Sequence, residues 1–422
     1  MKIRLYNAEI LTMKSTDIFH GEIHIENDKI TYVGKENKSA EHFDKELDMS
    51  GKLLMPSFKN AHTHSAMTFL RSYADDMPLQ DWLFKQVFPM EAKLNADRVY
   101  TLSRLAILEY LTSGITASFD MYFEPEAYAQ ANIDSGFRTV LCGAVSGDND
   151  ISILEDRFVK LNKLNPLISY KLGFHAEYTA PKPLLVEVSK LAAKYKAPVF
   201  THNSETKKEV DECIERHGMT PTQLFDNLGI YDYGGGGFHC VWFDDKDIEI
   251  FKKRNLWVVT NPASNIKLAS GVAPITKMLD NGVNLCIGTD GPASNNCLDM
   301  FREMFLVTAL QKLSNNDASA CPAEDVLKMA TTGGAKAMGL DDCDVLDEGK
   351  QADIIAIDLN QPNMQPLNNT VRNIVYSGSK QNVFMTMCAG KILYLNGEFF
   401  IGEEPQKIYE KSNQIISQMK SE

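Results

Sequence analysis

Residues 52–64 read KLLMPSFKNAHTH, an apolar stretch that runs into two histidines spaced two positions apart. Successive side chains of a β-strand point to opposite faces, so His62 and His64 would project from the same face. Two imidazoles side by side form half of a metal site. Taken alone, such a pair is more typical of a solvated turn, and the rest of the chain has to decide between the two interpretations.

Eight short apolar or β-branched runs can be traced along the chain, beginning with this one. They lie at residues 58–64, 115–121, 138–145, 168–176, 197–203, 237–243, 256–261 and 283–290. Amphipathic segments separate many of them, at residues 98–112, 184–194, 207–217, 245–254 and 273–281. This alternation predicts an α/β fold, a (β/α)8 TIM-like barrel over residues 57–349. A doubly wound open sheet is the alternative, but no G-x-G-x-x-G motif follows an early strand.

The two ends of the chain have a different rhythm, because apolar and polar residues alternate with a period of two. This pattern covers residues 2–13 and 21–33 near one end and residues 352–358 and 371–376 near the other. A hairpin is expected where Ala389-Gly390 joins residues 383–388 to 391–395. We therefore expect residues 1–56 and 350–422 to form one small β-sandwich domain, with a terminal helix over 407–420.

Composition limits the classes of partner. The chain of 422 residues is 44% hydrophobic and carries a net charge of −13, which argues against nucleic acid or an anionic membrane surface as partner. We find neither a signal-peptide core nor an apolar stretch of about 18 residues that could span a bilayer. The eight cysteines are scattered without a C-x-x-C pair, so we expect reduced thiols and a cytoplasmic location.

Polar residues gather where the predicted strands end. Five of the nine histidines and one aspartate lie there: His62, His64, His175, His202, His239 and Asp290. Barrel enzymes build their active sites at this carboxyl end of the strands, so the pattern predicts a metal site. Three imidazoles and one carboxylate fit zinc, with iron or manganese as alternatives. We expect His62, His64, His202 and Asp290 to bind one ion and leave a position open for water.

A single ion is expected because the fourth strand does not end in a lysine that could bridge two metals. Lys171 lies too early in that run. The water at the open position needs a base, and Glu205 follows His202 by three residues. Glu205 alone would be typical of a helix N-terminus, but beside a ligand we interpret it as a proton shuttle. His239 would hydrogen-bond the water.

Longer stretches support a narrower assignment. They are NAHTH at 60–64, RSYADDMPLQDWL at 71–83, PME at 89–91, NPASNIKLASG at 261–271 and GTDGPASNN at 288–296. These stretches resemble the amidohydrolase superfamily, and more narrowly its 5-methylthioadenosine/S-adenosylhomocysteine deaminase family. The resemblance covers nearly the whole chain. It implies zinc on the four ligands named above, with Glu205, His239 and Asp290 as catalytic residues.

The resemblance also implies how a purine nucleoside would be bound. Glu91 would hold the ribose hydroxyls, Trp82 would pack on the substrate, and His175 and Ser294 would line the pocket. Arg138 would meet the carboxylate of a homocysteine tail. For Trp82 a plain core position, for Arg138 an ordinary surface position and for Glu91 a helix N-terminus stay open as alternatives. Similar barrels are often dimers or larger, so a homo-oligomer is also compatible.

Three features depart from the family pattern. Glu177 stands where proline is frequent, Asn203-Ser204 separates His202 from Glu205, and residues 234–237 are four glycines. Glu177 near the pocket mouth would disfavour a carboxylate tail, so neutral 5′ groups such as methylthio are expected to be preferred.

The implied reaction is hydrolytic deamination of an adenine nucleoside such as adenosine, 5′-deoxyadenosine, 5′-methylthioadenosine or S-adenosylhomocysteine. Glu205 would carry a proton from water to purine N1, Asp290 would receive the second proton, and ammonia would leave. A deaminase of a free base or other heterocycle (guanine, cytosine, pterin, triazine) is the alternative. A non-enzymatic scaffold is a third interpretation, but scaffold relatives typically lose metal ligands.

Overall fold

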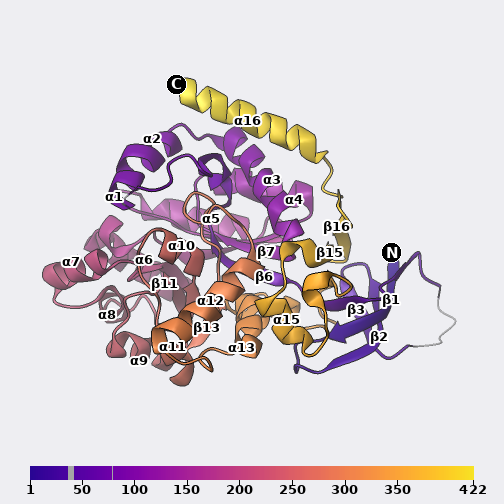
Figure 1. Cartoon of the computed structure of the whole chain (residues 1–422). Helices are drawn as coiled ribbons and strands as arrows, with labels where there is room; N and C mark the ends of the chain where they lie inside the picture. The colour runs from indigo at the N-terminus through magenta and orange to yellow at the C-terminus, as the bar shows by residue number, and fades with distance from the viewer. Residues whose placement is uncertain (37–41, 78) are drawn as a thin grey trace.

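Figure 1 presents a computed structural model of the chain, in which residues 1–36, 42–77 and 79–422 are described. Eight parallel strands form one sheet in the order in which they follow each other along the chain. They are β6 (Phe58–Thr63), β7 (Ile115–Asp120), β8 (Arg138–Cys142), β9 (Ile168–Gly173), β10 (Val199–Asn203), β11 (Gly235–His239), β12 (Trp257–Thr260) and β13 (Asn284–Ile287). All eight predicted strands are present.

The sheet curls round so that its last strand meets its first. The backbone N–H groups of Thr289 and Asp290, just after β13, donate to the carbonyl of His62 in β6 at 3.1 and 3.0 Å. Inward-facing side chains from the strands fill the interior, among them Ala61, Phe119, Phe200, Phe238 and Cys286. The interior is therefore a packed core, as in TIM barrels, and the predicted (β/α)8 barrel is confirmed.

Helices surround the sheet and cover its outer face (Figure 1). They are α3 (Ala96–Thr112), α4 (Pro125–Ser135), α5 (Ile151–Leu161), α6 (Lys182–Tyr195), α7 (Lys207–His217), α8 (Pro221–Asn227), α9 (Asp245–Lys253), α10 (Pro262–Lys267), α11 (Ile275–Asp280), α12 (Met300–Asn315), α13 (Ala323–Lys328) and α14 (Gly334–Met338). Between β6 and α3, a π-helical turn at Leu83–Val87 joins α1 (Leu79–Trp82) to α2 (Phe88–Glu91).

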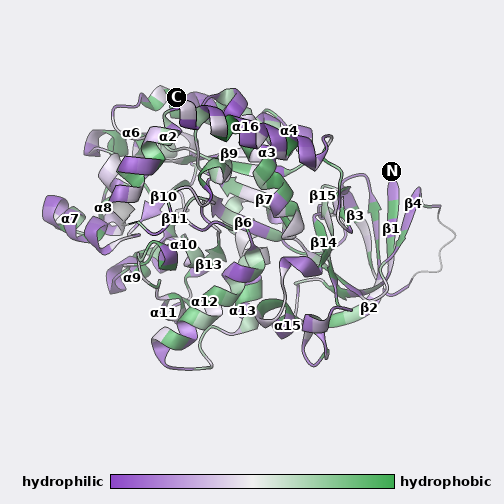
Figure 2. Cartoon of the chain, turned by 45° about the horizontal axis from the view of Figure 1, so that its top comes forward, coloured by the Kyte–Doolittle hydropathy of each residue, from purple (hydrophilic) through white to green (hydrophobic). Residues whose placement is uncertain are grey.

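The two ends of the chain build the second sheet, which lies beside the barrel (Figure 2). Its strands are β1 (Lys2–Leu11), β2 (Ile18–Glu26), β3 (Lys29–Gly34), β4 (Lys45–Asp48), β5 (Lys52–Pro56), β14 (Ile354–Asp358), β15 (Val383–Cys388), β16 (Lys391–Leu395) and β17 (Glu398–Phe399). Antiparallel pairing of β5 with β14 joins the two ends in one hydrogen-bonded sheet. Its apolar side chains form a core of their own, which includes Ile10, Ile23, Leu54 and Met385.

One element near the C-terminal end differs from the sequence prediction. Residues 371–376, expected as a strand, belong to helix α15 (Thr370–Tyr376). Asn369 caps this helix by accepting a hydrogen bond from the backbone N–H of Arg372 at 3.0 Å. The buried side chains Val371, Ile374 and Val375 are spaced three and four positions apart, which is the period of a helix face.

The predicted terminal helix is present as α16 (Pro405–Ser421) and crosses over α3 toward α2 (Figure 1). Lys93 donates to the carbonyl of Met419 at 2.5 Å, and Arg98 donates to the Glu422 carboxylate at 3.0 Å. Helix α16 is therefore hydrogen-bonded to the segment between α2 and α3 and to the first turn of α3. Among the described residues, no helix is both long and apolar enough to cross a membrane.

Candidate active site

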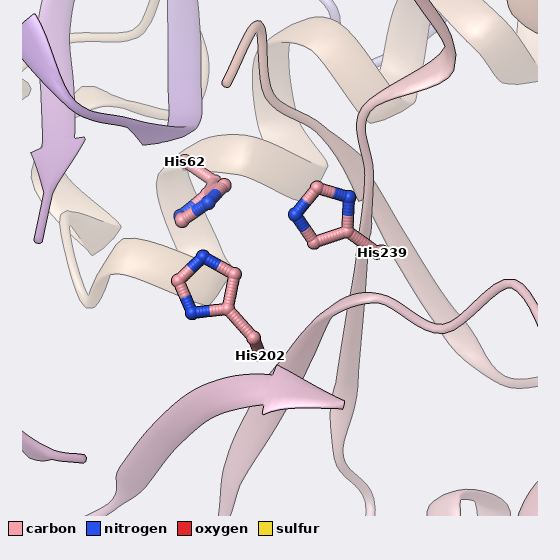
Figure 3. Close-up of side chains that lie close together, drawn as sticks. All are labelled: His62, His202 and His239. Atoms are coloured by element: carbon pink, nitrogen blue, oxygen red, sulfur yellow. The ribbon is translucent and has the colours of Figure 1, made fainter. Parts of the chain in front are cut away.

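The carboxyl ends of the barrel strands bring the predicted ligands together. The donor atoms of His62, His202 and His239 lie within 4.8 Å of one another, as do those of His62, His64 and Asp290. Figure 3 shows the first of these sets, with three imidazoles converging from β6, β10 and β11. His62 is common to both sets, so it stands at the centre of the cluster.

His62 is the clearest sign that the cluster takes a ligand. Both of its ring nitrogens are fully buried, and neither has a hydrogen-bond partner among the described residues. Burial lowers the pKa of His62 well below its ordinary value, so the ring is neutral and has a lone pair to offer. Buried polar atoms in proteins are nearly always satisfied. A divalent ion bound to one ring nitrogen of His62 would satisfy that nitrogen, so the residues present fit a metal.

His64 and Asp290 face each other beside His62. Their Nε2 and Oδ1 atoms are 3.2 Å apart, and the carbonyl of Met121 accepts from His64 Nδ1 at 2.5 Å. Burial lowers the pKa of His64, but the hydrogen bond to Asp290 and the charge of Asp290 outweigh it and raise that pKa to about 9. Two hydroxyls fix the other carboxylate oxygen, since Ser264 and Ser294 donate to Asp290 Oδ2 at 2.5 and 2.9 Å.

A hydrogen bond at Nδ1 fixes the ring orientation of His202, and another does the same for His239. The carbonyl of His175 lies 2.8 Å from His202 Nδ1, and Asn265 Oδ1 lies 2.7 Å from His239 Nδ1. Both acceptors require a proton on Nδ1, which leaves the Nε2 lone pair free, as is usual for imidazoles at metal sites. His239 has a left-handed φ of 72°, and Asp290 has one of 57°. Strained backbone of this kind concentrates at functional sites.

Glu205 reaches the site through a sharp turn after β10. Ser204 has a left-handed φ of 52°. The buried carboxylate of Glu209 accepts hydrogen bonds from the backbone N–H groups of Ser204 and Glu205 at 3.1 and 2.8 Å. Burial raises the pKa of Glu205, which favours proton exchange closer to neutrality. Glu205 thus lies in the wall of the cavity above the histidines, and its shuttle role remains a prediction.

A cavity of about 730 Å³ opens over the cluster. Its wall includes four predicted substrate residues: Trp82, Glu91, His175 and Ser294. Glu91 Oε1 accepts a hydrogen bond from the Tyr122 hydroxyl at 2.6 Å, and burial raises the pKa of the Glu91 carboxyl. The carboxylate is thus held in a fixed orientation at the cavity wall. The structure places these four side chains where the prediction needs them, and their contact with a substrate remains untested.

Arg138 does not belong to this group, and its predicted contact with a substrate tail is wrong. It is the first residue of β8, so it lies at the opposite end of the barrel from the cluster. Its guanidinium is buried and donates to Asp353 from Nε and an Nη at 3.0 and 3.1 Å. This pair links the barrel to the loop before β14 and occupies the guanidinium of Arg138.

The unusual residues noted in the sequence also have local explanations. Glu177 is buried and paired with Arg216, and His217 Nε2 lies 3.2 Å from its carboxylate, so its charge is neutralised away from the cavity wall. The expected repulsion of a carboxylate tail by Glu177 therefore lacks a basis. Of the four glycines, Gly235 allows β11 to lie close to β10. A Cβ on Gly235 would stand 1.9 Å from the carbonyl oxygen of Val199.

Sequence reasoning missed the residues that hold the site residues in place. They are Tyr122, Glu209, Ser264 and Asn265. Ser264 and Asn265 lie in the NPASN stretch that carried the family resemblance, so the signal was present without a role. For Tyr122, the one signal in the sequence was its position just after the end of β7.

Comparisons with known proteins agree with this geometry. The chain matches the Amidohydrolase family over residues 53–393. A protein of Thermoanaerobacter pseudethanolicus named 5-methylthioadenosine/S-adenosylhomocysteine deaminase is 39% identical over 409 residues, which cover 94% of this chain and 95% of that protein. A protein of Methanothermobacter thermautotrophicus named 5′-deoxyadenosine deaminase is 39% identical over 398 residues, or 92% of each chain.

A solved structure extends the similarity to three dimensions. An adenosine deaminase from Xanthomonas campestris with bound zinc superposes with a TM-score of 0.94 at 29% identity, covering 100% of this chain and 99% of that one. The family match spans the whole barrel and includes β14 and β15 of the second sheet. The chain therefore belongs to the amidohydrolase family, and within it to the 5-methylthioadenosine/S-adenosylhomocysteine deaminases.

Proposed function

We propose that this protein is a zinc-dependent aminohydrolase that converts the 6-amino group of an adenine nucleoside to a 6-oxo group and releases ammonia. The observation that carries the proposal is the Glu91 carboxylate, which shares one cavity with the histidine cluster and is oriented by Tyr122. A carboxylate there can accept hydrogen bonds from two vicinal hydroxyls. Ribose offers such a pair, and a free base does not.

His62, His64, His202 and Asp290 would hold the ion. When bound, zinc supplies a water of lowered pKa, which is a strong nucleophile at neutral pH. Zinc is favoured over iron or manganese because three imidazoles and one carboxylate suit its usual coordination, and the zinc-bound relative has the same fold. The orphaned nitrogens of His62 support this ligand set.

Glu205 and His239 would handle the attacking water. The His239 Nε2 lone pair, fixed by Asn265 on the opposite side of the ring, would accept a hydrogen bond from the water. Glu205 would take the proton and deliver it to purine N1, which makes C6 more electrophilic. Asp290 would receive the second proton, and the amino group would leave as ammonia. Proton transfer of this kind contributes about 100 to 10,000-fold in rate.

Cavity residues would position the nucleoside for this chemistry. Trp82 would pack on the substrate, and His175 would line the base pocket. Ser294 is better assigned as a partner of Asp290, since its hydroxyl already donates to that carboxylate. A cytoplasmic location is proposed because all eight cysteines are unpaired thiols. Assembly into a homo-oligomer stays a prediction.

An ammonia-release screen of the zinc-loaded protein tests the proposal. The substrates are adenosine, 5′-deoxyadenosine, 5′-methylthioadenosine, S-adenosylhomocysteine, adenine, guanine and cytosine. We expect the adenine nucleosides to be deaminated far faster than any free base. Replacing Glu91 by alanine (Glu91→Ala) should lower kcat/KM for nucleosides by about 10 to 100-fold, about the loss of one charge-assisted hydrogen bond. Turnover of adenine should change little in this variant. A free base as the best substrate would overturn the nucleoside assignment.

A further inference from the structure

The cavity continues well beyond the histidine cluster. Six largely apolar side chains line its far part, which we call the side chamber: Phe123, Pro125, Val145, Ile153, Leu154 and Tyr170. They come from the connections that follow β7 and β8, from the first residue of α4, from helix α5 and from strand β9. The chamber and the cluster are therefore parts of one continuous space beside α4 and α5.

A row of rings leads from the cluster to the side chamber. The ring centroids of His64 and Tyr122 are 6.0 Å apart, and those of Tyr122 and Phe123 are 5.1 Å apart. Tyr122 also holds Glu91, so the ribose hydroxyls would be bound at this midpoint. In a nucleoside the base and C5′ are attached to C1′ and C4′, which flank the ring oxygen, so the two groups leave the ribose in diverging directions. With the base at the cluster and the hydroxyls on Glu91, C5′ would point away from the cluster, toward the chamber.

The side chamber suits an apolar group. Phe123 is 55% exposed and Ile153 is 43% exposed, so an apolar ligand would remove their surface from water. Among the described lining residues outside the histidine cluster, the cations are Arg157 and Lys208, and each has an acidic partner. Arg157 Nε lies 3.0 Å from Glu126, and Lys208 Nζ lies 3.7 Å from Glu212.

An acidic group adds to this preference for an apolar ligand. Glu124 is exposed at the cavity wall next to Phe123. An entering carboxylate would meet an apolar wall and a like charge, with no unpaired Arg or Lys among the described lining residues. This ground for disfavouring a carboxylate tail is independent of Glu177, whose charge is already neutralised.

Building on the proposed function, we propose that the side chamber binds an apolar 5′ substituent. The enzyme then prefers 5′-alkylthio adenosines, including thioethers longer than methylthio, over nucleosides that carry an amino acid tail. Each added methylene that enters the chamber should strengthen binding by about three to fourfold until the chamber is full.

The test compares kcat/KM for adenosine, 5′-methylthioadenosine, 5′-propylthioadenosine and S-adenosylhomocysteine. We expect 5′-propylthioadenosine to exceed S-adenosylhomocysteine by at least about tenfold in the unmodified enzyme. Ile153→Arg adds a cation to the chamber and should narrow this ratio by about tenfold, since a charge-assisted pair with the tail replaces an apolar contact. Each kcat/KM value is compared with that of adenosine measured for the same variant. Leu164→Arg is the matched control, because Leu164 is equally apolar, 50% exposed and outside the cavity wall.

Two outcomes would overturn the inference. One is S-adenosylhomocysteine matching or exceeding the alkylthio substrates. The other is a selective loss of S-adenosylhomocysteine turnover in Arg157→Met, which would show that Arg157 leaves Glu126 to bind the tail. Absence of turnover with every nucleoside, adenosine included, would instead refute the proposed function. In that case calorimetry can compare the affinities of the protein for two 6-oxo products, 5′-propylthioinosine and S-inosylhomocysteine. Tighter binding of 5′-propylthioinosine would still support the apolar preference of the chamber.

Discussion

The two ends of the barrel each bury a cluster of charged side chains, and the clusters differ in how far their polar atoms are satisfied. At the amino end, Asp353 accepts from Arg138 at 3.0 and 3.1 Å and from the backbone N–H of Ala389 at 2.8 Å. Lys59 donates to the Ser57 hydroxyl at 2.6 Å, and its Nζ lies 4.0 Å from Asp353. At the carboxyl end, both ring nitrogens of His62 are buried and lack a hydrogen-bond partner in the part of the chain that the structure describes.

This difference indicates that the amino-end cluster is structural, whereas the carboxyl-end cluster is a candidate functional site. Burial raises the pKa of Asp353, but Arg138 and Lys59 outweigh it and hold that pKa well below its usual range. The amino-end cluster is thus a closed ion-pair network that ties the barrel to the second sheet. The carboxyl-end cluster leaves the two ring nitrogens of His62 for a ligand to satisfy. Burial and charge look alike at both ends, so these unsatisfied nitrogens are what distinguishes the carboxyl-end cluster from the amino-end cluster.

The largest expected effect comes from removing the central ligand of the open cluster. His62→Ala should deplete bound zinc and lower kcat/KM by more than about 1,000-fold, since both the activated water and its proton transfer depend on the ion. Elemental analysis and an ammonia-release assay measure the two effects. The melting temperature should stay close to that of the unmodified chain measured without metal.

Glu205→Gln serves as the control for His62→Ala. It should keep the zinc and the substrate affinity while kcat falls by at least about 100-fold. Full zinc occupancy in His62→Ala would refute the ligand assignment. A near-normal kcat in Glu205→Gln would move the base to another residue, with Asp290 and His239 as the next candidates.

A second prediction addresses the closed cluster. Asp353→Ala leaves two buried cations without their partner, so the free energy of unfolding should fall by about 3 to 5 kcal/mol. Zinc content and kcat per folded molecule should be unchanged, because Asp353 is far from the cavity wall. Urea unfolding followed by circular dichroism gives the stability, and an assay at low urea gives the activity.

Asp358→Ala is a matched control for Asp353→Ala. Asp358 ends β14 and pairs with Lys52 at 3.0 Å, but both side chains are partly solvated. Its loss should cost about 1 kcal/mol or less. Equal losses of stability in the two variants would mean that burial does not increase the contribution of the Arg138–Asp353 pair to the free energy of unfolding. A loss of zinc in Asp353→Ala would contradict the separation of the two ends.

The same contrast explains which features the sequence could predict. Strand ends were readable where an apolar run led into polar residues, as at His62, His202 and Asp290, so these residues fell at one end of the barrel. Arg138 was misplaced although its predicted run began at that residue, which already assigns it to the opposite end of the barrel. Strand direction excludes the pocket role that the family resemblance implies for Arg138. The partner of Arg138, Asp353, lies 215 residues further along the chain, and no local pattern shows such a pair.

Two other errors have similar causes. The pairing of Glu177 with Arg216 joins residues 39 positions apart, so the local sequence does not show that the charge of Glu177 is paired. Helix α15 was predicted as a strand because Val371, Ile374 and Val375 are β-branched, while their helical spacing and the Asn369 cap were overlooked. Local composition was readable in both cases, and long-range partners and caps decided the outcome.

The smallest expected effect concerns the hydrogen bond from His239 to Asn265. Asn265→Leu removes the acceptor of the His239 Nδ1 proton, so the ring can adopt the other tautomer and present N–H toward the water. We expect kcat/KM to fall by about 10 to 100-fold, the usual cost of losing an outer partner of a histidine at a metal site. The loss should appear in kcat rather than KM, and the pH profile should shift, neither of which a loosened fold alone would produce. Asn265→Asp keeps the acceptor and should recover at least half of the lost activation free energy. If both variants lose equally, the bond has no orienting role. His239 would then be held by the packing of its ring alone.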